Sequence, residues 1–329
     1  MKQPKQNPYI SKRSIRNTII KIIDNQDFSK KKIRKLTQVI TAAEDANLST
    51  LLAYLYDRWA NYLTNIAARK TGAEQAEYFR KAFKKYKKAT KLNPSSDKYF
   101  YNWGHALGEL AKLKGSAEAV KLELKGIKKY KQAAKLYSNF DSTYYNWASA
   151  LLNIALAQET DAKRKKYLKK AIPKLKKTIS INPWHENAWS KLGTIYSFLA
   201  ECESGKKADA WNNKAIACYA SVLRWSPRNV SVHDSWAIIL KDMALTKEGA
   251  EAEALFILAI KKHLQAIEYG EDVYNLACTY AAMGDERNAL IWLQKSVLKQ
   301  ELSPEEIWAD PDWKPYLTHK TFLEIMEGI

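Results

Sequence analysis

The segment 144-YYNWASALLNIA-155 repeats, with few changes, the segment 100-FYNWGHALGELA-111 that lies 44 residues before it. Both contain a large residue followed directly by a small one. This pair of residues occurs six times in the chain: Trp59-Ala60, Trp103-Gly104, Trp147-Ala148, Leu192-Gly193, Trp236-Ala237 and Leu276-Ala277. The small residues are separated by 44, 44, 45, 44 and 40 positions. Such a regular period is the sequence signature of a protein built from stacked repeats.

Each repeat predicts two helices. Trp103, Leu107, Leu110 and Ala111 fall at i, i+4, i+7 and i+8, which is one face of a helix. A second helical pattern follows in units one to five: Ala82, Tyr86 and Ala89; Gly126, Tyr130 and Ala133; Ala171, Leu175 and Thr178; Ala215, Tyr219 and Val222; Ala259, His263 and Ala266. Pro94, Pro183 and Pro227 come just after such patterns, where proline ends a helix. Each unit is therefore predicted to be an antiparallel helix pair, and the pairs must stack to bury their apolar faces.

The alternation of large and small residues has a packing reason. A helix that carries Gly or Ala lets its partner come close, and a facing aromatic side chain fills the groove between them. We therefore expect Trp59, Trp103, Trp147 and Trp236 to lie in the interior.

Unit four resembles a tetratricopeptide repeat (TPR). The segment 189-WSKLGTIY-196 with Ala215, Tyr219 and Pro227 has the residues typical of that family in the same order. The family period is 34 residues, and unit six keeps the family spacing from Tyr280 to Ala289. Units one to five carry about ten extra residues between the two helical patterns, which implies either longer helices or a longer loop.

The resemblance covers residues 50–300 and implies an all-α, right-handed solenoid of about six helix pairs, with first helices on the concave face and second helices on the convex face. We predict three regions. Residues 1–49 are a basic tail with capping helices, including an amphipathic helix at 30–46; residues 50–308 are the solenoid; and residues 309–329 are a C-terminal capping helix. In this last region Phe322, Leu323 and Met326 are expected to cover the final apolar face.

Composition argues against an enzyme. The 329 residues contain three cysteines and five histidines, none at the spacing of a metal site, and no nucleotide-binding or hydrolase motif. We expect no catalytic residue, no metal and no cofactor. The chain has no apolar run of the roughly 20 residues that span a bilayer and no signal-peptide core, so we expect a soluble cytoplasmic protein. The basic N-terminus leaves import into an organelle open.

The first helices carry polar residues away from their apolar faces. Arg58, Asn61 and Asn65 are spaced i, i+3 and i+7, and later units repeat this spacing with Asn102 and His105, with Asn146 and Ser149, and with Lys191. Asparagine inside a helix costs roughly 0.5–0.7 kcal/mol relative to alanine, so its recurrence needs a reason. Because an amide offers both a donor and an acceptor, these residues predict a groove that binds an extended peptide.

The resemblance adds detail to this groove. Asn102 and Asn146 occupy the position where peptide-binding TPR domains often place asparagine, and Arg58, His105 and Lys191 could receive an acidic side chain. A full carboxylate clamp is not matched, because Asp57 stands where that clamp has lysine. The open alternative is that the asparagines are only solvated or bond to other helices. Under the groove hypothesis, alanine at Asn102 and Asn146 should weaken a partner without lowering stability.

Charge suggests a second surface. Residues 1–227 hold 44 Lys and Arg against 18 Asp and Glu, whereas residues 228–329 hold 10 against 17. The segment 163-KRKKYLKKAIPKLKK-177 is the most basic, and its candidate binding residues are Lys165, Lys166, Lys169, Lys170, Lys176 and Lys177. Such a field attracts nucleic acid, an anionic membrane or an acidic protein, or it serves solubility alone.

The favoured hypothesis is a non-catalytic scaffold or adaptor that holds a protein partner, acidic or phosphorylated, in the concave groove. The alternative is a basic-surface binder of nucleic acid or of an anionic membrane. We expect mostly monomer, with weak head-to-tail self-association through the opposite charges of the two halves.

Overall fold

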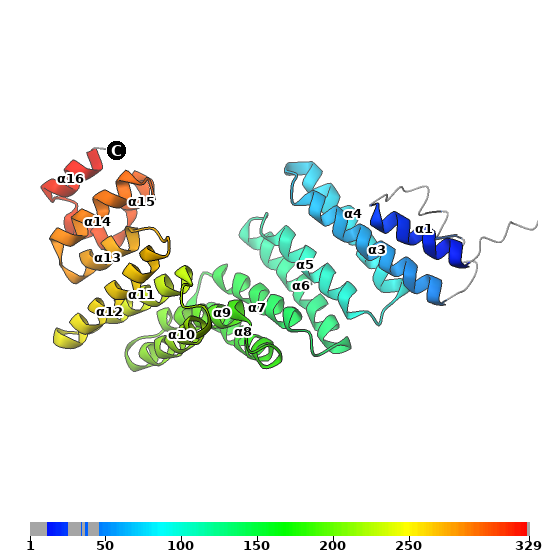
Figure 1. Ribbon diagram of the computed structural model, residues 1–329, viewed down its shortest axis with the longest axis horizontal. Helices are drawn as coiled ribbons and strands as arrows, with labels where there is room; N and C mark the ends of the chain where they lie inside the picture. Colours follow the sequence, from blue (N-terminus) through cyan, green and yellow to red (C-terminus); the bar gives the residue numbers. More distant parts are fainter. Residues whose placement is uncertain (1–11, 26–33, 35–36, 39–45, 328–329) are drawn as a thin grey trace, which may run out of the picture. The chain divides into compact units, whose positions relative to one another are not determined.

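The computed structural model describes residues 12–25, 34, 37–38 and 46–327 (Figure 1). The prediction of an all-α fold is confirmed, since the described residues form helices and turns and no strand. They contain six helix hairpins: α3 (Ala46–Ala67) with α4 (Gly72–Leu92), α5 (Asp97–Ala111) with α6 (Ser116–Leu136), α7 (Asp141–Leu156) with α8 (Asp161–Ile181), α9 (Glu186–Glu201) with α10 (Gly205–Trp225), α11 (Val230–Ala244) with α12 (Gly249–Glu268), and α13 (Tyr274–Met283) with α14 (Glu286–Leu298).

Short elements flank the hairpins. Helix α1 (Lys12–Asp24) precedes them, and α15 (Pro304–Ala309), the 3-10 helix η1 (Pro311–Tyr316) and α16 (Lys320–Glu327) follow them. None of the described helices is long and apolar enough to cross a bilayer. The amphipathic helix expected at 30–46 falls almost wholly outside the described residues.

The chain divides into two compact units, Met1–Ile181 and Asn182–Ile329. In the first unit, α5 packs against both helices of the preceding hairpin, α3 and α4, and α7 packs against both α5 and α6. In the second unit, α11 packs against α9 and α10 in the same way, and α13 packs against α11 and α12. Within each unit the first helices therefore form one layer and the second helices form the other.

The extra residues of units one to five lengthen the second helices. Helix α6 begins at Ser116, ten residues before Gly126, the first residue of its helical pattern. Helices α4, α8, α10 and α12 begin equally early, at Gly72, Asp161, Gly205 and Gly249. Helix α14, in the unit with the family spacing, begins at Glu286, only three residues before Ala289. Of the two explanations left open by the sequence, the longer helix is therefore the one observed.

The glycines of the second and fourth pairs face the second helix of their own hairpin. A Cβ atom added to Gly104 would lie 2.7 Å from Cε1 of Tyr130, and one added to Gly193 would lie 2.5 Å from Cε1 of Tyr219. Both distances are too short for carbon atoms in contact. Glycine at these two positions lets the tyrosine ring lie directly against the first helix.

This contact predicts the effect of Gly104→Ala. Overpacking against Tyr130 should outweigh the gain in helix propensity, so the free energy of unfolding should fall by about 1–2 kcal/mol. Gly108→Ala on the same helix is the matched control, because its Cβ would meet only the Glu123 carboxylate at 3.8 Å, and it should not destabilise. Urea denaturation of the two variants measures the difference. A Gly104→Ala protein at least as stable as the Gly108→Ala protein would contradict this account.

The expectation that all four tryptophans lie in the interior was wrong for three of them. Trp59 is buried, but Trp103, Trp147 and Trp236 are only half-buried. The second helix of each hairpin lays a lysine ammonium over the indole, at these distances from Nζ to the ring centroid: Lys85 to Trp59 3.4 Å, Lys129 to Trp103 3.7 Å, Lys174 to Trp147 4.0 Å, and Lys262 to Trp236 4.2 Å. The indoles are thus covered by cation–π contacts where a neutral core side chain was expected.

Both ends of the array are covered. At the N-terminal end, Ile15, Ile19 and Ile22 of α1 are buried in the same cluster as Leu52 and Leu55 of α3. At the C-terminal end, Phe322 and Met326 are buried as expected, while Leu323 is half-buried. Trp313 of η1, which is fully buried, is the largest side chain of that cluster.

Candidate functional site

Helices α3 and α5 of the first unit border a polar hollow. Its volume is about 400 Å³, and its lining includes five of the eight side chains predicted for a groove: Arg58, Asn61, Asn65, Asn102 and His105. Thr64, Tyr86 and Glu109 complete much of the wall. The hairpin geometry produces this grouping, because α5 packs directly on α3 and presents the same face of the repeat.

A buried carboxylate lies among these residues. Asp57 is 3% exposed and accepts hydrogen bonds from Nδ2 of Asn102 at 3.0 and 3.1 Å and from Nδ2 of Asn61 at 3.2 Å. Tyr86 donates its hydroxyl to Oδ1 of Asn61 at 2.6 Å. Burial raises the pKa of Asp57 to about 6, although the two amides and the nearby Arg58 act in the opposite direction. A carboxylate whose pKa is raised by burial therefore adjoins Asn61 and Asn102 of the hollow.

The bond between Asn102 and Asp57 belongs to a recurring pattern. Asn146 donates to the hydroxyl of Tyr101 at 3.0 Å, and Asn275 donates to the carboxylate of Asp234 at 3.1 and 3.2 Å. In each case the asparagine directly precedes the large residue of its own unit. Its partner lies two positions before the large residue of the preceding unit. These asparagines thus tie neighbouring hairpins together.

This pattern changes one sequence-based expectation. Removal of the Asn102 amide would leave the buried Asp57 with fewer donors, so alanine at Asn102 and Asn146 should lower stability as well as any binding. Sequence reasoning assigned no role to Tyr101, Asp234 or Asn275. The sequence does contain a sign of this role for Asn275, because Asn275 directly precedes Leu276 just as Asn102 directly precedes Trp103.

The remaining predicted groove residues lie elsewhere. Ser149 of α7 donates its hydroxyl to the backbone carbonyl of Tyr145, so its side chain is partly engaged within its own helix. Lys191 is on α9, which belongs to the second unit. The structure thus brings together the groove residues of units one and two.

The predicted basic residues of α8 lie at the surface. Lys166, Lys169, Lys170, Lys176 and Lys177 are exposed, and Lys165 is half-buried. Leu168, Ala171, Leu175 and Thr178 are the buried residues of this helix. The lysines therefore occupy the side of α8 that faces solvent.

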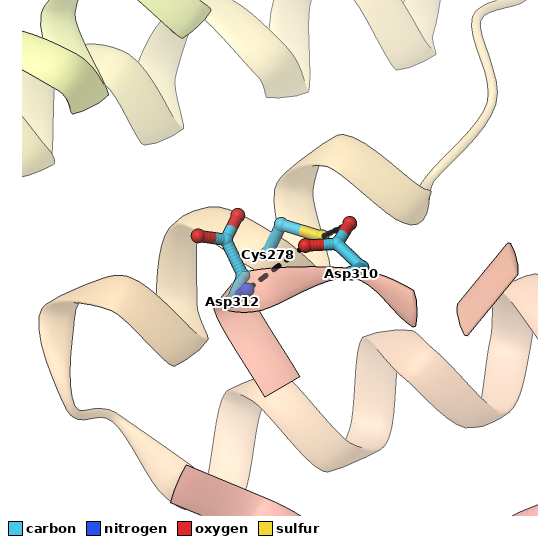
Figure 2. A group of neighbouring side chains, drawn as sticks. All are labelled: Cys278, Asp310 and Asp312. Carbon is cyan, nitrogen blue, oxygen red and sulfur yellow. Dashed lines mark hydrogen bonds between the residues drawn. The ribbon is translucent and has the colours of Figure 1, made fainter. Parts of the chain in front are cut away.

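Cys278, Asp310 and Asp312 form a cluster of residue types that can bind metals (Figure 2). Figure 2 shows the Cys278 thiol and the backbone N–H of Asp312 both directed at the Asp310 carboxylate, at 3.7 and 2.9 Å. Tyr274 donates its hydroxyl to Asp310 at 2.9 Å, and Lys241 pairs with Asp312 at 2.5 Å. Burial, with the adjacent acids, raises the pKa of the Cys278 thiol. These partners explain the cluster as a network that fixes η1 to α13.

The family described as "Plant specific mitochondrial import receptor subunit TOM20" matches residues 138–256, just over a third of the chain. A comparison with curated proteins gives no significant match.

Several solved structures are similar to part of this chain. YrrB, titled "a TPR protein with an unusual peptide-binding site", is 16% identical over 70% of this chain and 95% of its own, with a TM-score of 0.45. TTC0263 of Thermus thermophilus is 15% identical over 68% and 98%, with a TM-score of 0.43. MamA of Desulfovibrio magneticus is 16% identical over 64% and 94%, with a TM-score of 0.44. The six helix hairpins and the period of the sequence are those of a TPR-like helical repeat protein.

Proposed function

We propose that this protein is a non-catalytic scaffold or adaptor that binds another protein as an extended segment in the hollow between α3 and α5. The observation that carries the proposal is the gathering of Arg58, Asn61, Asn65, Asn102 and His105 around one polar hollow. The partial match to a family of import receptor subunits also supports a role in binding other polypeptides.

The polar groups of the hollow suit a peptide backbone. The amide nitrogen of Asn102 donates to Asp57. No described residue donates to the Oδ1 atom of Asn102, which can therefore accept a hydrogen bond from an N–H group of a bound chain. Asn65 is exposed and offers both a donor and an acceptor. A segment in extended conformation presents alternating N–H and C=O groups that match such side chains.

The charges of the hollow argue against a strongly acidic ligand. Arg58 is exposed and would attract a carboxylate or phosphate, as the sequence predicts. The structure adds the Glu109 carboxylate, which pairs with Lys112 at 2.7 Å, to the wall, and the buried Asp57 carboxylate beside Asn61 and Asn102; both lower the positive potential of the hollow. We therefore favour recognition through the backbone over recognition of an acidic or phosphorylated side chain.

The test uses side chains that do not tie the hairpins together. Arg58, Asn65 and His105 are all exposed, so the triple variant Arg58→Ala, Asn65→Ala, His105→Ala should keep its unfolding midpoint. Affinity purification from the native cell, followed by mass spectrometry, identifies the partner. Titration then measures its affinity, which should fall by about tenfold or more in the variant.

A triple variant on the second helix α4 provides the control. Lys84→Ala, Lys87→Ala, Lys91→Ala changes exposed residues outside the lining of the hollow, and it should bind the partner normally. The proposal is rejected if the Arg58, Asn65 and His105 variant binds the partner normally while the lysine variant loses binding, because the partner would then bind outside the hollow.

A further inference from the structure

Helices α4, α6 and α8 share a strongly basic outer surface. We define the basic face by the exposed Lys and Arg residues of these three helices: Arg80, Lys84, Lys87, Lys88, Lys91, Lys121, Lys125, Lys128, Lys131, Lys135, Lys163, Lys166, Lys169, Lys170, Lys176 and Lys177. All sixteen belong to the first unit, so the face does not depend on how the two units are arranged.

Acidic residues hardly interrupt this face. The exposed acids of the three helices, Glu74, Glu77, Glu118 and Asp161, lie within the first six residues of their helices. Glu123 is buried and accepts a hydrogen bond from Asn153 at 2.7 Å. The remaining length of each helix presents only positive charge to solvent.

The face extends in two directions. Along α4, Arg80, Lys84, Lys87 and Lys91 follow the repeat of the helix and span about 17 Å, at about 1.5 Å per residue. Across the layer, α4 and α6 both pack against α5, and α6 and α8 both pack against α7. The three rows of cations therefore lie on one side of the unit and form a broad array.

The chemistry of the array fits nucleic acid poorly. Trp59 is buried, and Lys129 and Lys174 cover the rings of Trp103 and Trp147, so these rings are not open to stack on bases. Fifteen of the sixteen cations are lysine, whereas arginine is the side chain that forms paired bonds to base edges.

Other features of the array fit a bilayer surface. Leu124 and Leu136 of α6 are 40% and 43% exposed, and Tyr137 directly after this helix is 50% exposed. They lie on and beside the middle helix of the face. Lys121 and Lys128 are three and four residues from Leu124, about one helical turn away, and Lys135 directly precedes Leu136. Apolar and aromatic side chains flanked by lysine are the combination that settles in the headgroup region of anionic membranes.

We propose that the basic face of α4, α6 and α8 binds the surface of an anionic lipid bilayer. The attraction acts between lysine ammonium groups and lipid phosphate and carboxylate groups, and the exposed leucines and Tyr137 enter the headgroup region. This interaction is separate from the hollow between α3 and α5, which lies on the layer of first helices. A membrane-bound molecule could thus hold a protein partner at the same time.

Sedimentation with vesicles tests the proposal on the full chain. The protein should sediment with phosphatidylcholine vesicles that contain phosphatidylserine and stay in solution with pure phosphatidylcholine, and salt should weaken the binding. The quadruple variant Lys84→Glu, Lys128→Glu, Lys166→Glu, Lys170→Glu should lose about tenfold or more in affinity. Lys206→Glu, Lys207→Glu, Lys261→Glu, Lys314→Glu changes the net charge equally, at exposed positions of the second unit, and should bind almost as the wild type does.

Two further measurements separate lipid from nucleic acid. Leu124→Ser with Leu136→Ser should weaken vesicle binding, because nucleic acid has no apolar layer for these side chains to enter. Duplex and single-stranded RNA should compete poorly with vesicles at equal phosphate concentration. Absence of sedimentation with anionic vesicles, equal losses in the two charge variants, or tighter binding to RNA than to vesicles would each overturn the proposal. Circular dichroism confirms that every variant is folded.

Discussion

Replacement of Trp313 by alanine should lower the free energy of unfolding of the second unit by about 3–5 kcal/mol. Trp313 is 0% exposed and lies with its ring centroid 5.7 Å from that of Phe322 and 5.5 Å from that of Tyr316. Its indole N–H donates to the hydroxyl of Tyr274 at 3.0 Å. The substitution therefore removes both a large apolar contact and a buried hydrogen bond, and urea denaturation followed by circular dichroism measures the loss.

Trp308→Ala is the matched control for this experiment. Trp308 is 43% exposed and touches the same Phe322 edge-on, with ring centroids 5.3 Å apart. Its removal should cost clearly less than the removal of Trp313, because 43% of its surface is already in water. Similar losses in the two variants would show that η1 does not hold the C-terminal cap as described.

The cap illustrates how far the sequence could predict this end of the chain. Apolar residues at helical spacing pointed to Phe322 and Met326, and both are buried. The segment before them gave no such pattern, because η1 is a short 3-10 helix with proline at its start and within it. Trp313 therefore could not be assigned to the core by periodicity, and its partner Tyr274 lies 39 residues away.

The hairpins were predictable because their packing residues recur. Every unit needs a small residue where its two helices cross, so the same pair of residues returns at each layer. Whether the ten extra residues of each unit lengthen a helix or a loop could not be predicted in this way. In α8 these residues are 161-DAKRKKYLKK-170, a polar stretch with few apolar positions, and such a stretch is compatible with either a helix or a loop.

The covered tryptophans left a signal in the sequence that periodicity alone does not reveal. The lysine over each indole directly precedes the large residue of the second helix, as in Lys129-Tyr130. Unit four has Leu192 in place of tryptophan, and Cys218 stands in the place of the lysine. The exchange of both partners in one unit fits a contact that needs an aromatic ring and a cation together.

The candidate site was predictable as a face but not as a set of contacts. Helical spacing places Asn61 and Asn102 on the polar side of their helices, yet it does not show that both donate to Asp57. That contact depends on the distance between stacked hairpins. The sequence left open whether the asparagines bond to other helices, and the structure shows that the amide nitrogen of Asn102 does so.

Asp57→Asn should make the stability of the first unit less dependent on pH. The carboxyl has an ordinary pKa of 3.8 and a raised pKa of about 6 in the folded chain, chiefly because it is buried. A raised folded-state pKa means that the folded state binds the proton more tightly. The contribution of the Asp57 proton to the stability of the folded state is therefore complete below about pH 3.8, and it is lost as the pH rises through about 6. At neutral pH the wild-type protein contains a buried charge that the variant lacks.

The magnitude follows from the difference between the two pKa values. A difference of about 2 corresponds to roughly 3 kcal/mol, so the stability of Asp57→Asn relative to the wild type should rise by roughly 2–3 kcal/mol between about pH 4 and pH 7. Urea denaturation across this range measures the change. Glu159→Gln, which removes an exposed carboxyl, should follow the wild-type curve and exclude a general effect of net charge. If the Asp57→Asn curve also parallels the wild type, the carboxyl is not held in the buried, amide-bonded position from which its raised pKa arises.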